Sequence, residues 1–131
     1  MSNLINFGRQ NTKVAVQKFD FSDVPTGVAS ALKIAVPSGA IVLGGGVQVT
    51  TAFNSTTNVV DVGDSGSANR FANDLDLKTL GFKPLTTLGL LGSGLKAVEF
   101  THTSTGAAAT AGAGYVVVTY VEPTRADEVM E

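Results

Sequence analysis

The feature that most restricts the fold of this chain is a two-residue alternation of apolar and polar side chains, which recurs in short segments along most of its length. In the clearest segment, Val98 and Phe100 alternate with Glu99 and Thr101. Because successive side chains of a strand point to opposite faces, this period is typical of half-buried β-strands. Gly, Ser, Asn and Pro separate the segments at about 8–12 residue intervals, as in sandwiches and barrels. The sequence therefore predicts an all-β fold, a single-domain antiparallel β-sandwich that is jelly-roll-like and has extended terminal arms.

Several details of the strands follow from the same pattern. Val14 and Val16 share one face whereas Phe19 and Phe21 share the other, which predicts a bulge near residues 17–18. The glycine triplet at 44–46 is expected to form a bend or a close backbone approach rather than strand interior. We expect strands at 12–21, 31–36, 40–53 (with Val47, Val49, Thr51 and Phe53 on one face), 59–62, 96–103 and 114–122, with weaker candidates around 84–87 and just after.

Other segments depart from the alternation. Residues 68–77 follow Ser67, a residue that can cap a helix, and are expected to form a turn or two of helix. Residues 104–112 are rich in Ala, Gly and Thr and are expected to form a loop. The expected organisation is an N-terminal arm at 1–11, a sandwich domain at 12–122 and a C-terminal tail at 123–131. An arm can pair with a neighbour's edge strand. The candidate inter-subunit contacts are therefore the side chains of the arm and tail that lie outside the core: Leu4, Ile5, Phe7, Arg9, Val129 and Met130.

Composition excludes several classes of function. The 131 residues carry a net charge of -2, without the basic surface that a nucleic-acid binder needs. The absence of Cys removes disulfides and thiol chemistry, and a single His cannot build an imidazole metal cluster. We therefore expect no cofactor, no metal and no enzymatic activity. The low charged fraction, 15%, has two explanations that stay open: a surface covered by copies or a partner, or one made polar by Ser, Thr and Asn.

The N-terminal residues show no basic segment followed by an apolar run, as a signal peptide would. The longest uncharged apolar stretches, such as 34–49, are interrupted by Pro, Ser and Gly and fall short of the roughly 20 residues that span a bilayer. We expect synthesis in the cytoplasm and no membrane partner.

The sequence matches known catalytic and ligand-binding motifs only in part. The segment Gly63-Asp64-Ser65-Gly66 matches the surroundings of a serine-protease nucleophile, but the sole His follows it in the chain, so a polar turn is favoured. The aspartates between 61 and 76 do not have the spacing of a calcium loop. His102 shares a face with Val98 and Phe100, which favours a half-buried, hydrogen-bonded imidazole over a catalytic one. Residues 89–96 have glycines but not the order of a phosphate loop, and are expected to connect a hairpin.

One part of the sequence carries a family likeness. Residues 47–64, in which a Thr-Ala-Phe-Asn-Ser turn leads to a Val-Gly-Asp end, together with Arg70-Phe71 and Asp74–Leu77, resemble small virion proteins of tailed bacteriophages. Related proteins include capsid cement or decoration proteins with jelly-roll folds. The resemblance implies a structural protein on the outer capsid surface of the virion that binds the major capsid protein and forms a homo-oligomer, with a homotrimer favoured. The alternatives are a tail, baseplate or fibre component, or a carbohydrate-binding sandwich, which the absence of Trp disfavours.

Overall fold

The structure is a computed structural model that describes residues 3–4, 12–27, 32–122 and 129–130. These residues form strands, turns and loops, and contain no helix. Accordingly, the described part of the chain holds no helical segment able to cross a membrane. The strands are β1 (Asn3–Leu4), β2 (Lys13–Asp20), β3 (Leu32–Ala35), β4 (Ile41–Thr51), β5 (Thr57–Asp64), β6 (Ser67–Asp76), β7 (Gly81–Pro84), β8 (Gly89–Leu90), β9 (Ala97–Thr105), β10 (Ala113–Val121) and β11 (Val129–Met130).

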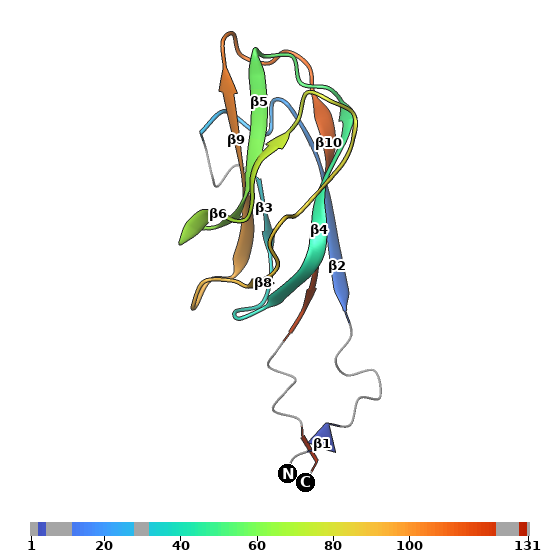
Figure 1. Cartoon of the computed structure of the whole chain (residues 1–131), viewed down its shortest axis with the longest axis vertical. Coiled ribbons are helices and arrows are strands. Elements are labelled where there is room, and N and C mark those ends of the chain that lie inside the picture. The colour runs from blue at the N-terminus through green and yellow to red at the C-terminus, as the bar shows by residue number, and fades with distance from the viewer. Residues whose placement is uncertain (1–2, 5–11, 28–31, 123–128, 131) are drawn as a thin grey trace.

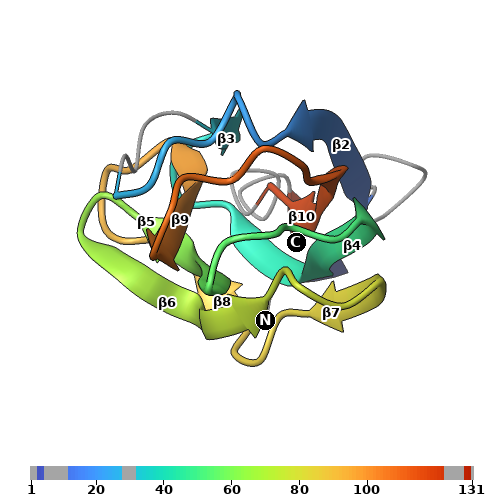
Figure 2. The same ribbon diagram turned by 90° about the horizontal axis from the view of Figure 1, so that it is seen from above.

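Two antiparallel sheets pack face to face (Figures 1 and 2). One has the strand order β2-β10-β4-β7, and β8 also pairs with β4; the other has the order β3-β9-β5-β6. A separate two-stranded sheet joins β1 to β11. The predicted antiparallel β-sandwich is therefore confirmed, whereas its jelly-roll arrangement stays a prediction.

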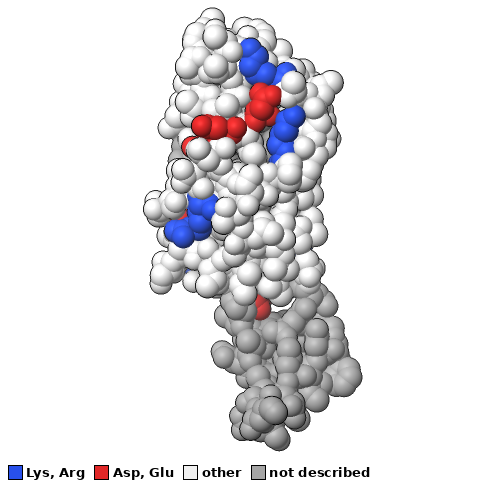
Figure 3. All heavy atoms as spheres, in the orientation of Figure 1, with Lys and Arg blue, Asp and Glu red and all other residues white. Residues whose placement is uncertain are grey.

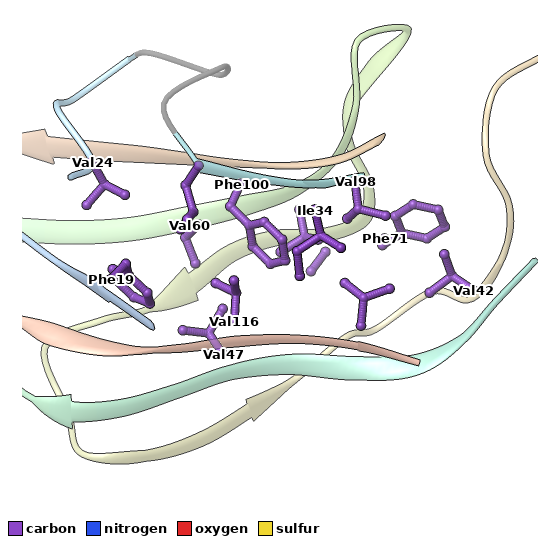
Figure 4. Packing of buried hydrophobic residues seen from close by; sticks show 14 of the residues in the cluster. Phe19, Val24, Ile34, Val42, Val47, Val60, Phe71, Val98, Phe100 and Val116 are labelled. Atoms are coloured by element: carbon purple, nitrogen blue, oxygen red, sulfur yellow. The ribbon is translucent and has the colours of Figure 1, made fainter. Parts of the chain in front are cut away.

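The core fills the space between the two sheets, as Figure 4 shows. Val116 and Val47 contribute from one sheet, and Phe100 and Val98 from the other, all at most 1% exposed. Leu32, Ile34 and Val36 are buried as their alternation predicts. Burial of these apolar side chains at roughly 25 cal/mol per Å² is the main stabilising term of such a sandwich.

β4 changes its inward face along its length. Its buried valines are Val42 at one end, an even-numbered position, and Val47 and Val49 at the other, which are odd-numbered. Register shifts against β10 occur where Leu43 and Thr50 are passed over, so each adds one residue to the strand. The glycine triplet thus lies inside a strand, contrary to expectation, although the expected close backbone approach is present at Gly45.

Two further details of the predicted strands are wrong. β2 pairs with β10 in continuous register from Lys13 to Asp20, so no bulge exists at 17–18. The change of apolar face there has another origin: Phe19 points into the core while Val14 and Val16 lie on the outer face. Thr51 is exposed instead of sharing the inner face of Val47, because the extra residue at position 50 reverses the alternation.

The helix expected at 68–77 is also wrong. These residues form β6, which pairs with β5 through Val60↔Leu75 and Val62↔Ala72. Two register shifts interrupt the pairing, so the buried residues Phe71 and Ala72 are adjacent and the two-residue period is lost. Pairing with β5 gives these residues backbone hydrogen bonds to a neighbouring strand. A helix of two turns would be only marginally stable without packing.

Both ends of the sandwich domain lie side by side. Lys13, the first residue of β2, pairs with Tyr120 near the end of β10, and its ammonium lies 3.4 Å from Glu122. The first and last strands of the sandwich therefore begin and end at the same end of it, and β1 and β11 pair with each other (Figure 1).

Candidate functional site

The protease-like segment is the turn of the β5–β6 hairpin. Ser65 is exposed at its tip, and the buried Asp64 carboxylate accepts hydrogen bonds from the backbone N–H of Gly66 and Ser67. The sole His lies elsewhere, bonded to Asn58 and not to Ser65. The expectation of a polar turn is confirmed.

Asp64 also connects three segments of the chain through hydrogen bonds. Its carboxylate accepts from Arg70 Nε at 2.5 Å and from the backbone N–H of Gly92 at 2.9 Å. Burial by itself raises the pKa of Asp64, but the hydrogen bonds from Arg70, Gly92 and Ser67 outweigh it and hold the pKa below its usual value. The group ties the β5–β6 hairpin to the loop after β8, so its role is to hold the fold.

His102 lies in a buried chain of hydrogen bonds. Its Nδ1 donates to the carbonyl of Val24 at 2.8 Å, so its Nε2 accepts from Asn58 Nδ2 at 2.9 Å. The Asn58 Oδ1 in turn accepts from the backbone N–H of Ser55. With 4% exposure the imidazole is more deeply buried than expected, and both ring nitrogens are occupied, as a structural role requires.

One hollow lies at the end of the sandwich opposite to where the terminal segments leave. It has a volume of about 200 Å³ and is lined by Phe21, Val24, Pro25, Thr26, His102, Ser104, Gly106, Ala108 and Ala109. The imidazole of His102 already has partners for both nitrogens, so the hollow offers no free reactive group from that residue. Among the described residues, no group of three or more His, Cys, Asp or Glu side chains is placed to hold a metal ion.

The outer faces of the two sheets differ in character. On the sheet β3-β9-β5-β6 the outward residues include charged and polar side chains beside Val59: Lys33 lies opposite Glu99, and Asp61 lies opposite Thr101. This is the usual arrangement for a solvated face of an antiparallel sheet.

The outer face of β2-β10-β4-β7 is largely apolar. One row across it consists of Val16, Val117, Gly46 and Pro84. In a neighbouring row, Tyr115 and Phe82 alternate with the polar residues Lys18 and Gln48. Val14 and Val16 are 61% and 58% exposed. We call this surface the apolar face and define it by Val14, Val16, Phe82, Pro84, Tyr115 and Val117. Its outward charges lie toward one end of β2, at Lys18 and Asp20.

Charge is sparse elsewhere as well. On the side of the molecule seen in Figure 3, charged side chains gather in a few groups and most of the described surface is uncharged. The apolar face is the larger anomaly, because an exposed sheet face normally carries polar side chains. It is the candidate interaction surface of this molecule.

The sequence-predicted contact residues divide into two groups. Leu4 pairs with Val129 in the β1–β11 sheet, and Met130 pairs with Asn3. Ile5, Phe7 and Arg9 lie outside the described residues. The structure thus pairs residues 3–4 with residues 129–130, whereas the sequence predicts an arm and a tail without indicating that they contact each other.

Sequence reasoning did not single out the apolar face. Its signal was present in β2, where Val14 and Val16 point away from the side of Phe19, so that the strand is apolar on both faces. Such a strand is expected when both of its faces are covered. The contribution of Phe82 depends on the pairing of β7 with β4, which the sequence does not reveal.

Comparisons with known proteins point to bacteriophage capsids. A scan of protein-family models finds no match, and neither does a search of curated proteins. Among solved structures, a chain of the cyanophage Pam1 capsid asymmetric unit is 31% identical with a TM-score of 0.63, over 87% of this chain and 86% of that one. A chain of the acid-stable capsid of Helicobacter pylori bacteriophage KHP30 shares the fold at 22% identity, with a TM-score of 0.61 over 91% and 90% of the two chains.

These neighbours and the two-sheet fold define a class, the capsid-associated structural proteins of bacteriophages. Within it, the identity and coverage of the Pam1 match show that this chain belongs to the same family as the matched protein of the cyanophage Pam1 capsid.

Proposed function

We propose that this protein is a cement or decoration protein, which binds the outer surface of a bacteriophage capsid and reinforces it. The observation that carries the proposal is the 31% identity to a chain of the Pam1 capsid asymmetric unit, spread over nearly the whole sandwich. Its partner is the major capsid protein, and its working form is a homo-oligomer, with a trimer favoured.

The physical design of the chain supports this role. A cement protein needs a rigid body and surfaces that contact neighbours, and it needs no reactive centre. The core and the buried hydrogen bonds of Asp64 and His102 supply the rigid body. The Ser of the protease-like segment is an exposed turn residue without a His partner, so that segment gives no support to an enzyme.

The terminal segments are the proposed contacts with the shell. Both leave the sandwich at one end, beside the Lys13–Glu122 ion pair. In sequence these segments carry apolar and basic side chains, which we propose as the groups that contact neighbours. The proposed contact residues are Leu4, Ile5, Phe7, Arg9, Val129 and Met130.

The test is binding to capsids of the same virus that were assembled without this protein. We expect saturable, stoichiometric uptake in a sedimentation assay, and cryo-electron microscopy of the loaded capsid should show new density on the outer surface. Failure to bind at any salt concentration would contradict the proposal. Density on the tail or baseplate of intact virions, with none on the head, would assign the protein to those structures instead.

Deletion of residues 1–10 tests the terminal contacts. We expect the shortened protein to unfold at nearly the same temperature as the full chain but to bind capsids more weakly. Collapse of its thermal stability would show that the N-terminal segment belongs to the folded core, and unchanged capsid binding would remove the segment from the interface.

A further inference from the structure

The apolar face is expected to be covered by a binding partner. The outward residues of the opposite sheet include Lys33, Glu99 and Asp61, so this fold can carry a solvated face. On the apolar face, most of the corresponding positions are valine, tyrosine, glycine, proline and phenylalanine, and the polar exceptions, Lys18 and Gln48, lie in one row with Tyr115 and Phe82. Exposure of such a face without a partner favours aggregation, so a contiguous apolar surface of this kind marks a contact.

The shape of the face restricts what binds there. On the central strand β4, Gly46 places no side chain between Val117 and Pro84, and Gly44 places none beside Thr119. The surface is therefore low in relief, and a flat apolar surface packs well against another sheet at a separation of about 10 Å.

The charge of the face also restricts its partner. Lys18 and Asp20 lie toward one end of β2, and the rows that contain Val16 and Val14 carry no charge. A charged partner surface would be desolvated there without a counter-charge, which is unfavourable. The complementary partner is thus another uncharged apolar surface, and the apolar face of a second copy meets this requirement.

The direction of the terminal segments indicates which neighbour lies beside the face. The apolar face lies on a side of the sandwich that runs along its strands, whereas Lys13 and Glu122, at the start and the end of the sandwich, lie together at one end (Figure 1). If that end is directed toward the shell, as proposed above, the side is directed toward an adjacent molecule on the same shell. We infer that the apolar face is the contact between neighbouring copies of this chain; this inference rests on the proposed function.

The size of the face predicts how strong this contact is. With strands about 4.8 Å apart and about 3.3 Å per residue, the face covers roughly 300–400 Å². A stable interface usually buries roughly 800 Å² on each partner. The contact is therefore weak and reversible in free solution, and it becomes effective between copies held side by side, where the local concentration is high.

The experiment measures self-association of the purified protein by analytical ultracentrifugation over a wide concentration range. The variant Val16→Lys places a charge on the edge strand β2, in the uncharged row that crosses the apolar face. The matched control Thr103→Lys places the same charge on an exposed strand position of the opposite sheet, beside Val59. We expect the wild-type mass to rise with concentration, Val16→Lys to weaken association by at least about tenfold, and Thr103→Lys to behave as wild type.

Several outcomes would overturn the inference: a wild-type protein that stays monomeric at every concentration, equal association of Val16→Lys and wild type, or equal losses in both variants. Circular dichroism checks that each variant is folded. If Val16→Lys does not fold, Val14→Lys replaces it, because Val14 is 61% exposed and its side chain contributes little to the core.

Uptake by empty capsids separates this inference from the proposed function. If both are right, Val16→Lys still fills the capsid sites but loses the cooperativity of wild type. If neither protein binds capsids while wild type still self-associates, the proposed function fails and the contact between copies stands. If Val16→Lys loses binding to isolated sites, the face contacts the shell and the inference is wrong.

Discussion

Arg70 donates through Nε to the Oδ2 of Asp64 at 2.5 Å, across the turn that joins β5 to β6. The carboxylate is fully buried, whereas the Arg70 side chain is 34% exposed. Asp64 also accepts from the N–H of Gly66, Ser67 and Gly92, so one side chain satisfies donors of the turn and of a loop 28 residues away. Asp64 therefore joins the β5–β6 turn to the loop after β8.

The substitution Asp64→Asn is expected to lower the free energy of unfolding by about 2 kcal/mol. The amide of Asn has only one oxygen, so it cannot accept hydrogen bonds from all of these donors, and Arg70 loses its ion pair. Because Arg70 is partly exposed, water solvates its guanidinium and limits the loss of stability. Urea unfolding measures it. The control is Asp61→Asn, on the polar outer face, where one backbone N–H from Asp74 is affected. Equal losses in the two variants would contradict the role assigned to Asp64.

The free energy of unfolding should decrease in acid because Asp64 becomes protonated. The opposing effects of burial and of hydrogen bonds from Arg70, Gly92 and Ser67 leave the pKa of Asp64 below its usual value. Because the folded pKa lies below that of the unfolded chain, about 3.9, the contribution is fully present above that value. It is lost as pH falls through the lower, folded pKa. Unfolding in urea between neutral pH and about pH 3 measures this loss.

The control for the acid effect is the Asp64→Asn protein, which should lose less stability over the same pH range. Some acid sensitivity remains in it, because the hydroxyl of Thr79 and the N–H of Lys78 also lower the pKa of Asp76. An identical decline in wild type and variant would show that Asp64 does not titrate as proposed.

The buried pair of Asn58 and His102 gives a separate prediction. Asn58→Ala removes the donor to His102 Nε2 and the acceptor for the N–H of Ser55, so two buried polar groups lose partners. We expect a loss of about 2–3 kcal/mol in the free energy of unfolding. A double-mutant cycle with His102→Ala should give a coupling energy of about 1 kcal/mol or more. Additive losses would show that the hydrogen bond contributes nothing.

The sequence was most informative where each strand obeys the two-residue period. Val98 and Phe100 were assigned correctly to the core because β9 pairs without register shifts on both sides. β6 was misread because bulges place Phe71 and Ala72 next to each other in the core. Its strand character comes from pairing with β5, which local sequence does not encode.

The apolar face, too, depends partly on strand pairing that local sequence does not encode. The outward direction of Val14 and Val16 follows from alternation in β2, so these two of its six residues can be predicted from the sequence. Pro84 and Phe82 join it only through the register of β7 against β4. The pairing of Leu4 with Val129 likewise joins residues at opposite ends of the chain, and no local pattern indicates it.

The glycine triplet of β4 provides a matched pair of substitutions. A Cβ at Gly45 would meet the backbone carbonyl oxygen of Val117, and its φ of +123° is one that other residues rarely adopt. At Gly44 a Cβ meets nothing within 4 Å. Gly45→Ala should therefore lower the free energy of unfolding by about 2–4 kcal/mol, because β4 and β10 must separate or strain.

Gly44→Ala should leave the free energy of unfolding within about 1 kcal/mol of wild type, since it removes unfolded-chain freedom and adds no clash. Thermal and urea unfolding of the two variants measure the difference. Because β4 and β10 form the centre of the sheet that carries the apolar face, Gly45→Ala should also weaken self-association at concentrations where Gly44→Ala does not. Equal stability of the two variants would mean that the close approach of β4 to β10 is not required by the fold.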